Sequence, residues 1–351
     1  MYQFHWPTKT ILGRGVISEI TDHLPSPPSG ASVMIAGHQD PWAEPLANQI
    51  AASLQTHGWS QVIHFLEVEP NPSWKTVQSG AQRAGEAEVE LVVAVGGGSV
   101  MDAAKVIAER SGVDFLCTVP TTAGTGGEIS PWAVISNTET REKDSLTAKW
   151  PDLTLLDPEL TRTLPPQATL FTGIDAFIHG LEAYLSSAAN PLTDALALQG
   201  MQLIQEHLQR AIQSGQDLDA RQGMLEGSLL TGAAMLHAGL GLMHAIGNVT
   251  GGLYHQLPHG LILMRCLDAV LDYNQPVTGE KYQRIRPMVE DVRDLAHQQF
   301  QELSVPEITI QTSDLVLLAE RAAANVNAET NPRPATPEDI QQIVRTAFHV
   351  Q

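Results

Sequence analysis

The hydrophobic periodicity of this 351-residue chain changes once, near residue 160, and no other feature constrains the fold as strongly. Before that point, short β-rich runs alternate with stretches of helical period, a pattern typical of βαβ units around a parallel sheet. Strands are expected at 32–36, 61–66, 91–95 and 113–119, and helices at 45–57 and 73–87. After residue 160, almost every patterned stretch repeats every 3.6 residues.

We therefore predict two domains: an α/β N-terminal domain of Rossmann-like type over residues 1–160, and an all-α C-terminal domain over residues 161–351. The helices expected in the second domain are 173–185, 191–214, 218–239, 241–254, 279–300, 313–325 and 337–348. The hydrophobic content of 43% is enough to give each domain its own core.

Charge and cysteine content exclude several classes of protein. The formal net charge of −19, from 20 basic and 39 acidic residues, repels phosphate backbones, so nucleic acid is not expected as a partner. No apolar run reaches the roughly 20 residues of a membrane span, and the first residues lack the pattern of a signal peptide. The two cysteines, Cys117 and Cys266, lie in apolar runs, which fits a cytoplasmic protein.

The strongest strand, LVVAV, runs directly into Gly96-Gly97-Gly98-Ser99 and a helical stretch. Glycines allow a phosphate to approach the backbone, and a helix N-terminus offers free N–H donors. Ser99 and Asp102 have the spacing of a capping box, which places the helix start at Ser99. The alternative is a tight turn without a ligand, but three successive glycines exceed what a turn requires, so the pattern favours a ligand.

A second loop rich in hydroxyls and glycine, PTTAGTGGE over residues 120–128, leaves the next strand. In a parallel sheet, both loops emerge at the carboxyl ends of strands, where ligands bind. Two such loops suit a dinucleotide better than a single phosphate. Taken alone, the second loop is equally consistent with an ordinary surface loop.

Two segments of the second domain carry potential metal ligands. Asp175 and His179 lie four residues apart, and therefore on one face of a helix that is otherwise apolar. His244 lies in a Gly/Ala-rich helical run, and His259 lies in a Leu-Pro-His-Gly turn. Each pair alone is consistent with a buried hydrogen bond or a core histidine. Together, three imidazoles and one carboxylate suit a divalent first-row metal such as Fe²⁺ or Zn²⁺.

Several motifs of the chain, taken together, resemble those of a known family. GGGSVMDAAK, PTTAGTGGE, DPEL, TGIDAFIHGLEAYLS, HAIGN, PHG and TNPRPATPEDI are similar, in this order, to the iron-containing (group III) alcohol dehydrogenases. These belong to the dehydroquinate synthase-like superfamily, which also includes glycerol dehydrogenases and maleylacetate reductases. The resemblance implies a Rossmann-like domain followed by a helical domain. It also implies hydride transfer between NAD(P)(H) and a small alcohol, aldehyde or ketone.

The resemblance assigns site residues by motif match. It implies metal ligation by Asp175, His179, His244 and His259. The implied cofactor contacts are Asn71, Gly97, Gly98, Ser99, Asp102, Thr121, Thr122, Ser130 and Lys143. Family members that prefer NAD often carry an aspartate after the second strand. Here Gly37 takes that place, and a glycine leaves room for a 2′-phosphate, so NADP(H) is expected rather than NAD(H).

Asn248 occupies a position where many family members carry a histidine assigned to proton relay, so His255 is the expected catalytic residue here. Two alternatives stay open. One is a dehydroquinate synthase-like cyclase, which needs many basic residues for an anionic substrate, whereas this chain has 20 Lys and Arg in all. The other is a metal-binding protein without enzymatic activity. A homodimer is the expected state of a cytoplasmic dehydrogenase.

Overall fold

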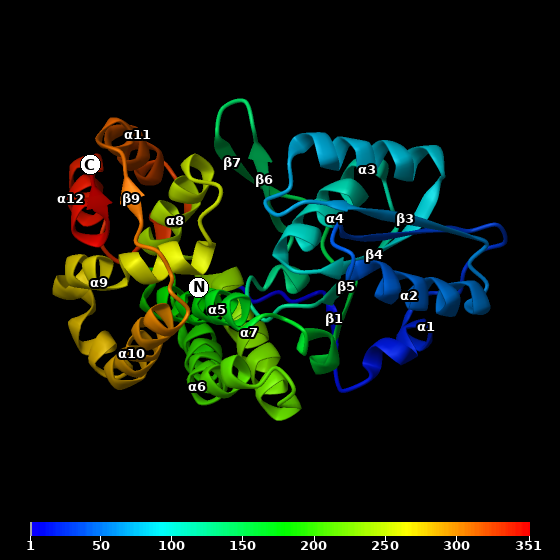
Figure 1. The fold of residues 1–351 in the computed structure, drawn as a ribbon, viewed down its shortest axis with the longest axis horizontal. Coiled ribbons are helices and arrows are strands. Elements are labelled where there is room, and N and C mark those ends of the chain that lie inside the picture. Colours follow the sequence, from blue (N-terminus) through cyan, green and yellow to red (C-terminus); the bar gives the residue numbers. More distant parts are fainter. Residues whose placement is uncertain (1) are drawn as a thin grey trace. The chain divides into compact units, whose positions relative to one another are not determined.

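The computed structural model describes residues 2–351, and the chain forms two compact units (Figure 1). Residues Trp6–Leu164 form one, called here the α/β unit. Pro165–Gln351 form the other, called the helical unit, which also includes residues 2–5.

The α/β unit is built on a six-stranded sheet in the order β1-β8-β5-β4-β2-β3, with every neighbouring pair parallel. Its strands are β1 (Lys9–Leu12), β2 (Ser32–His38), β3 (Gln61–Val68), β4 (Val89–Gly96), β5 (Phe115–Pro120) and β8 (Leu153–Leu156). Its helices are η1 (Val16–Glu19), α1 (Ile20–His23), α2 (Ala43–His57), α3 (Trp74–Glu86), α4 (Gly98–Ser111), η2 (Gly127–Ile129) and η3 (Pro158–Thr161).

Both faces of the sheet are covered by helices, which explains why the central strands are apolar without interruption. Val92 and Ala94 of β4 pack in one core with residues of α3 and α4. Leu91 and Val93 point to the other face and pack with residues of α1 and α2. The period of two along β4 thus divides its side chains between two cores.

The α/β unit also contains an antiparallel hairpin of β6 (Trp132–Asn137) and β7 (Glu142–Thr147), which the sequence patterns did not predict. The side chains of β7 are exposed or half-buried, so this strand lacks an apolar run. The strands β1 and β8 were also missed. Each is only four residues long, too short for a periodic signal.

The helical unit is centred on α5, whose residues from Thr169 to Leu185 are buried except Thr172. It packs against α6, α7 and α9. The helices are α5 (Pro166–Leu185), α6 (Pro191–Gln213), α7 (Leu218–Ala238), α8 (Leu242–Leu253), α9 (His259–Gln283), α10 (Arg286–Glu302), α11 (Thr312–Ala323), η4 (Val326–Thr330) and α12 (Pro337–Ala347). Two short strands, β9 (Thr309–Ile310) and β10 (His349–Val350), pair in parallel.

Two expectations for this unit are wrong. The predicted helix 279–300 is two helices, because α9 ends at Gln283 and α10 begins at Arg286. Pro287, in the first turn of α10, lacks an N–H and therefore favours a new helix start over continuation. His259 does not lie in a turn but is the first residue of α9, after the extended Pro258.

Within residues 2–351, no individual helix is both long and apolar enough to cross a membrane. The helices α7 and α8, bent by 101° at their junction, meet the length and composition criteria only as a pair.

Candidate active site

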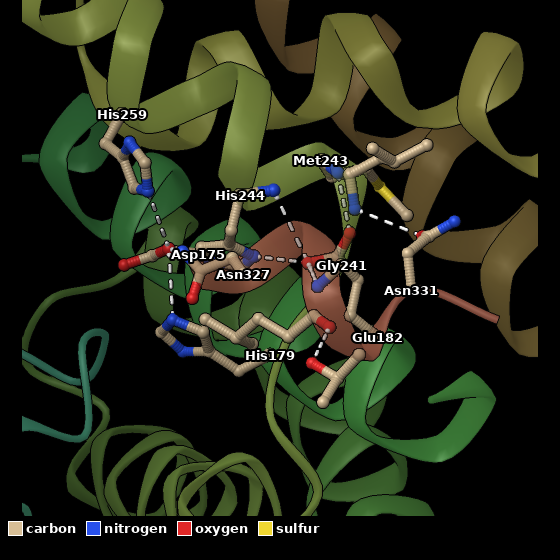
Figure 2. A network of polar contacts seen from close by, with 12 residues as sticks. Asp175, His179, Glu182, Gly241, Met243, His244, His259, Asn327 and Asn331 are labelled. Carbon is tan, nitrogen blue, oxygen red and sulfur yellow. Dashed lines mark hydrogen bonds and ion pairs between the residues drawn. The ribbon is translucent and has the colours of Figure 1, made fainter. Parts of the chain in front are cut away.

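Three histidines from three helices of the helical unit face one carboxylate oxygen, Oδ1 of Asp175 (Figure 2). The Nε2 atoms of His244, His179 and His259 lie 3.4, 3.5 and 3.7 Å from Asp175 Oδ1. One ligand atom from each of Asp175, His244 and His259 lies within 4.8 Å of the other two, and the predicted ligand His179 is not part of this group. The ring of His179 stacks on that of His244 with a centroid distance of 4.6 Å. Helical spacing places Asp175 and His179 side by side on α5, as predicted.

A second buried carboxylate, Glu182, holds His244 from the opposite side. Its Oε2 lies 2.6 Å from His244 Nδ1. It also accepts hydrogen bonds from the backbone N–H groups of Gly241 and Met243, at 3.0 and 2.7 Å. Because the carboxylate accepts, Nδ1 carries a proton, and Nε2 is the ring atom that faces Asp175. Metal-binding histidines commonly have such a carboxylate partner.

The donor set fits a divalent metal. His244 Nδ1–H donates to Glu182, so in a neutral His244 the Nε2 lone pair faces the Asp175 oxygen at 3.4 Å. Two hydrogen-bond acceptors then face each other unless a cation or a proton lies between them. Burial lowers the pKa of His244, but hydrogen bonds to Asp175 and Glu182 raise the pKa to about 9. Burial also opposes ionisation of Asp175, yet its three histidine neighbours hold the pKa of this carboxyl well below its ordinary value. The cluster therefore attracts positive charge.

Gly260 explains how α9 brings His259 so close to α5. An ideal Cβ at Gly260 would overlap the carbonyl oxygen of Phe171 and lie 2.8 Å from its carbonyl carbon. Phe171 precedes Asp175 by one helical turn. A glycine directly after His259 therefore allows the start of α9 to rest on the α5 backbone next to the carboxylate.

In the α/β unit, the two predicted loops lie against each other. Gly97 and Gly98 follow β4, and α4 begins at Gly98. An ideal Cβ at Gly97 would lie 3.2 Å from Thr122 Oγ1, and one at Gly98 would lie 2.5 Å from Thr125 Cγ2. The N–H of Thr121 donates to Gly96 O at 2.9 Å, which ties the ends of β4 and β5 together. The glycines thus permit the second loop to pass close to the start of α4.

Three further predicted cofactor residues form a connected group. The N–H of Asn71 donates to Ser99 Oγ at 3.1 Å, and Lys143 Nζ donates to Asn71 Oδ1 at 2.9 Å. Asn71 has a φ of 55°, a left-handed conformation that asparagine tolerates better than most residues. Sequence positions 71, 99 and 143 are therefore joined by side-chain contacts beside the glycine loop.

The expected capping box at Ser99 and Asp102 is wrong. The N-cap of α4 is Gly97, and Asp102 Oδ2 accepts instead from the N–H of Val134 at 3.1 Å. Its other oxygen lies 3.3 Å from the fully buried Lys105 Nζ. Burial raises the pKa of Asp102 and lowers the pKa of Lys105, while their ion pair opposes both shifts. Ser99 and Asp102 have the sequence spacing of a capping box, but the Asp102 carboxylate instead pairs with the charged Lys105, which is a stronger interaction.

The remaining predicted residues lie in different surroundings. Gly37 lies in β2, and an ideal Cβ at Gly37 would lie 2.8 Å from Leu66 Cδ2. The Leu66 side chain therefore occupies the space where a side chain at position 37 would begin. Ser130 is buried directly after η2. His255 is exposed in the segment between α8 and α9 and is not among the three residues whose ligand atoms converge.

Glu182, Lys105 and Asn331 were not predicted from the sequence. Glu182 follows His179 by three residues on the same face of α5, and a carboxylate at that spacing on an apolar helix was an available signal. Lys105 follows Asp102 by three residues in α4. Asn331 lies in the TNPRP segment, and its contacts with α8 arise only from the tertiary fold.

Two family models together match most of the chain. "Iron-containing alcohol dehydrogenase" matches residues 7–158, and "Fe-containing alcohol dehydrogenase family, C-terminal" matches residues 169–348.

Curated relatives and solved structures agree with these matches. The NAD-dependent methanol dehydrogenase of Bacillus methanolicus is 30% identical, over 99% of this chain and 100% of the relative. The 1,3-propanediol dehydrogenase of Klebsiella pneumoniae is 34% identical, over 82% of this chain and 84% of the relative. A crystal structure of 1,3-propanediol oxidoreductase superposes with a TM-score of 0.89 at 29% identity, covering 99% of this chain and 100% of that one. The chain is a member of the iron-containing alcohol dehydrogenase family.

Proposed function

We propose that this chain transfers a hydride between NAD(P)(H) and a small alcohol or its aldehyde or ketone, with a divalent metal at the Asp175 cluster. The observation that carries the proposal is the convergence of the buried Asp175 and His244 with the half-buried His259, whose ligand atoms lie within 4.8 Å of one another. The relatives named for methanol and 1,3-propanediol support a small alcohol as the substrate class.

The chain's own residues hold the reactants. Asp175, His179, His244 and His259 would bind the metal, and both Fe²⁺ and Zn²⁺ suit this donor set. Glu182 keeps His244 in the tautomer whose Nε2 is available as a ligand. When bound, the metal supplies Lewis acidity to the hydroxyl or carbonyl oxygen, and the nicotinamide supplies the hydride acceptor or donor.

The α/β unit would hold the cofactor. The N–H groups at the start of α4 and the hydroxyls of Thr121 and Thr122 suit a pyrophosphate. We infer that Asn71, Ser99 and Lys143, already joined by hydrogen bonds, act as one group toward the cofactor. Asp102 supports this site through its contacts with Lys105 and the β6 backbone, and Ser130 lies at the end of the second loop.

Oxidation of an alcohol releases a hydride to the cofactor and a proton to solvent, so the proton needs a path. We propose His255 for this role, because it is exposed and precedes His259 by four residues. The substitution His255→Asn should lower the rate of alcohol oxidation and change its pH profile while leaving metal content unchanged. An unaltered pH profile would remove His255 from the mechanism.

The proposed reaction is tested by stopped-flow absorbance in the reduced-nicotinamide band. Metal-loaded protein should give net formation of NAD(P)H with short primary alcohols and net consumption with the matching aldehydes. A cyclase that uses NAD only transiently would give no net change. Absence of turnover with Fe²⁺ and Zn²⁺ and with both cofactors would overturn the proposal.

We further propose that NADP(H) is preferred over NAD(H). The positions at the end of β2, Gly37 and His38, carry no carboxylate to repel a 2′-phosphate, and the next acidic residue, Asp40, is exposed beyond the strand. The ratio of kcat/KM for the two cofactors tests this preference. A higher value for NAD⁺ would contradict it and would make Asp40 the residue to substitute.

We also propose that the enzyme works as a cytoplasmic homodimer. Its cysteines, Cys117 and Cys266, are buried thiols, which suits a reducing compartment. Light scattering after size-exclusion chromatography should give twice the chain mass of 37.9 kDa. A mass of one chain at micromolar concentration would contradict the dimer.

A further inference from the structure

The short segment between α7 and α8 determines where His244 lies. It runs from Gly239 to Gly241, and α8 begins at Leu242, so His244 is the third residue of the helix. The first N–H groups of any α-helix have no partner within the helix. In α8 these N–H groups point toward buried surroundings, because Leu242, Met243 and His244 are each at most 2% exposed. They therefore need acceptors from elsewhere in the chain.

Two side chains distant in sequence supply these acceptors. The N–H of Leu242 donates to Asn331 Oδ1 at 3.1 Å. The N–H groups of Met243 and His244 donate to Glu182, at 2.7 and 3.4 Å. Figure 2 shows Asn331 and Glu182 beside this first turn, with Asp175 beyond His244. Asn331 therefore acts as an N-cap of α8 supplied from the far end of the chain.

The Asn331 amide is itself fixed in orientation. Its Nδ2 donates to Asn274 Oδ1 at 2.8 Å and to the carbonyl of Arg333 at 2.6 Å. Asn274 Nδ2 donates back to Asn331 Oδ1 at 3.1 Å. Both amides are buried, at 4% and 3% exposure. This reciprocal pair determines which end of the Asn331 amide faces Leu242.

The side-chain oxygens of Asn331 and Glu182 both contact the backbone from Gly241 to Leu242. An ideal Cβ at Gly241 would lie 2.8 Å from Glu182 Oε1 and 2.9 Å from Asn331 Oδ1. Glu182 also lies 2.6 Å from His244 Nδ1, so it contacts both the helix start and the imidazole. A shift of the Leu242 backbone would therefore also move the contact between His244 and Glu182.

We propose that Asn331 is a positioning residue of the metal centre, because its side-chain oxygen caps the first turn of α8 and so fixes His244 as a ligand. The inference assigns a role to the TNPRP segment, which has no part in the proposed reaction itself. It rests on the proposed metal site. It predicts that Asn331 changes metal affinity although it lies outside the ligand set.

The test compares Asn331→Ala with Asn190→Ala. Asn190 Oδ1 caps α6 by accepting from Leu192 N and Thr193 N at 3.1 and 3.3 Å, so its removal also costs a helix N-cap, in a helix that packs on α5, α7 and α10. Zn²⁺ affinity of the metal-free, full-length protein is measured by competition with a chromophoric chelator. We expect Asn331→Ala to weaken Zn²⁺ binding about tenfold or more, which is the usual effect of losing an outer partner of a metal ligand. Asn190→Ala should keep the wild-type affinity.

A second readout reports ligand geometry. The visible spectrum of the Co²⁺-substituted protein should change in Asn331→Ala and remain that of the wild type in Asn190→Ala. Should Asn331→Ala fail to fold, Asn274→Ala replaces it, because it frees the Asn331 amide without removing the Leu242 cap; a few-fold weaker Zn²⁺ binding is then expected. Wild-type Zn²⁺ affinity and Co²⁺ spectrum in the Asn331 or Asn274 variant would overturn the inference alone. Absence of metal binding by the wild-type protein would instead overturn the proposed metal site.

Discussion

The close approach of α9 to α5 at Gly260 gives a sharp prediction. In Gly260→Ala, the new methyl carbon would overlap the Phe171 carbonyl oxygen and lie 2.8 and 3.0 Å from its carbonyl carbon and Cα. Carbon atoms in contact prefer about 3.5–4.0 Å, so the start of α9 must move by about 1 Å. The opposing atoms belong to helix backbone and cannot rotate away. Overpacking of this kind costs about 1–3 kcal/mol of unfolding free energy.

The same shift moves His259, which precedes Gly260 directly. We expect Zn²⁺ affinity to fall at least about tenfold, since loss of the supporting structure of a ligand typically has this effect. Two assays measure the outcome: urea unfolding of the metal-free protein, and chelator competition for Zn²⁺.

Gly279→Ala is the matched control within α9. Its ideal Cβ meets only Gln275 Nε2, at an ordinary 3.8 Å. Replacing a helical glycine by alanine at an open position should stabilise the protein by up to about 1 kcal/mol without changing metal affinity. Wild-type stability and wild-type Zn²⁺ affinity in Gly260→Ala would refute the argument that glycine is required for this approach.

Three further predictions follow from the site. Asp175→Asn should abolish stoichiometric metal binding, measured by elemental analysis, because it removes the carboxylate on which the three histidines converge; one metal per chain in the variant would contradict its role. His244 has its pKa raised from 6.5 to about 9 in the metal-free protein, so it holds a proton that a metal must displace. Zn²⁺ affinity should therefore increase with pH up to about 9. The stability that the protonated His244 gives the metal-free protein should be fully present below pH 6.5 and lost as the pH rises through 9. A Zn²⁺ affinity that does not change between pH 6 and pH 9 would disprove this coupling. Gly98→Ala should weaken NAD(P)H binding, measured by fluorescence titration, because its Cβ would lie 2.5 Å from Thr125 Cγ2 and separate the two loops; unchanged cofactor affinity would show that the loops do not bind it.

The sequence predicted the features that depend on local periodicity. The central strands and helices of the α/β unit appear close to their expected positions, because long runs of one period leave few alternatives. The helix starting at His259 was missed because a Pro-His-Gly string resembles a turn. Its actual packing, with Gly260 against the α5 backbone, is a tertiary contact that no local pattern contains.

In the candidate site too, contacts set by local spacing could be predicted from the sequence, and contacts made by the tertiary fold could not. Asp175 and His179 are related by helical spacing, so their proximity could be predicted from sequence. Glu182 shares this helical spacing, so its place beside His179 was also predictable, but its contact with His244 was not, because His244 lies about 60 residues away along the chain. Asn331 carried no such signal, because its partner in α8 lies about 90 residues away. The capping box at Asp102 illustrates the opposite error, in which a local pattern was present but the buried Lys105 provided a stronger partner.

The most direct test of the account is the rate of NAD(P)H formation from a short primary alcohol, measured as Fe²⁺ or Zn²⁺ is titrated anaerobically into metal-free protein. The account predicts no turnover before metal is added and a linear rise that saturates at one metal per chain, as expected for a single site at Asp175, His179, His244 and His259. Full turnover in the metal-free protein, or turnover that does not respond to metal, would contradict it.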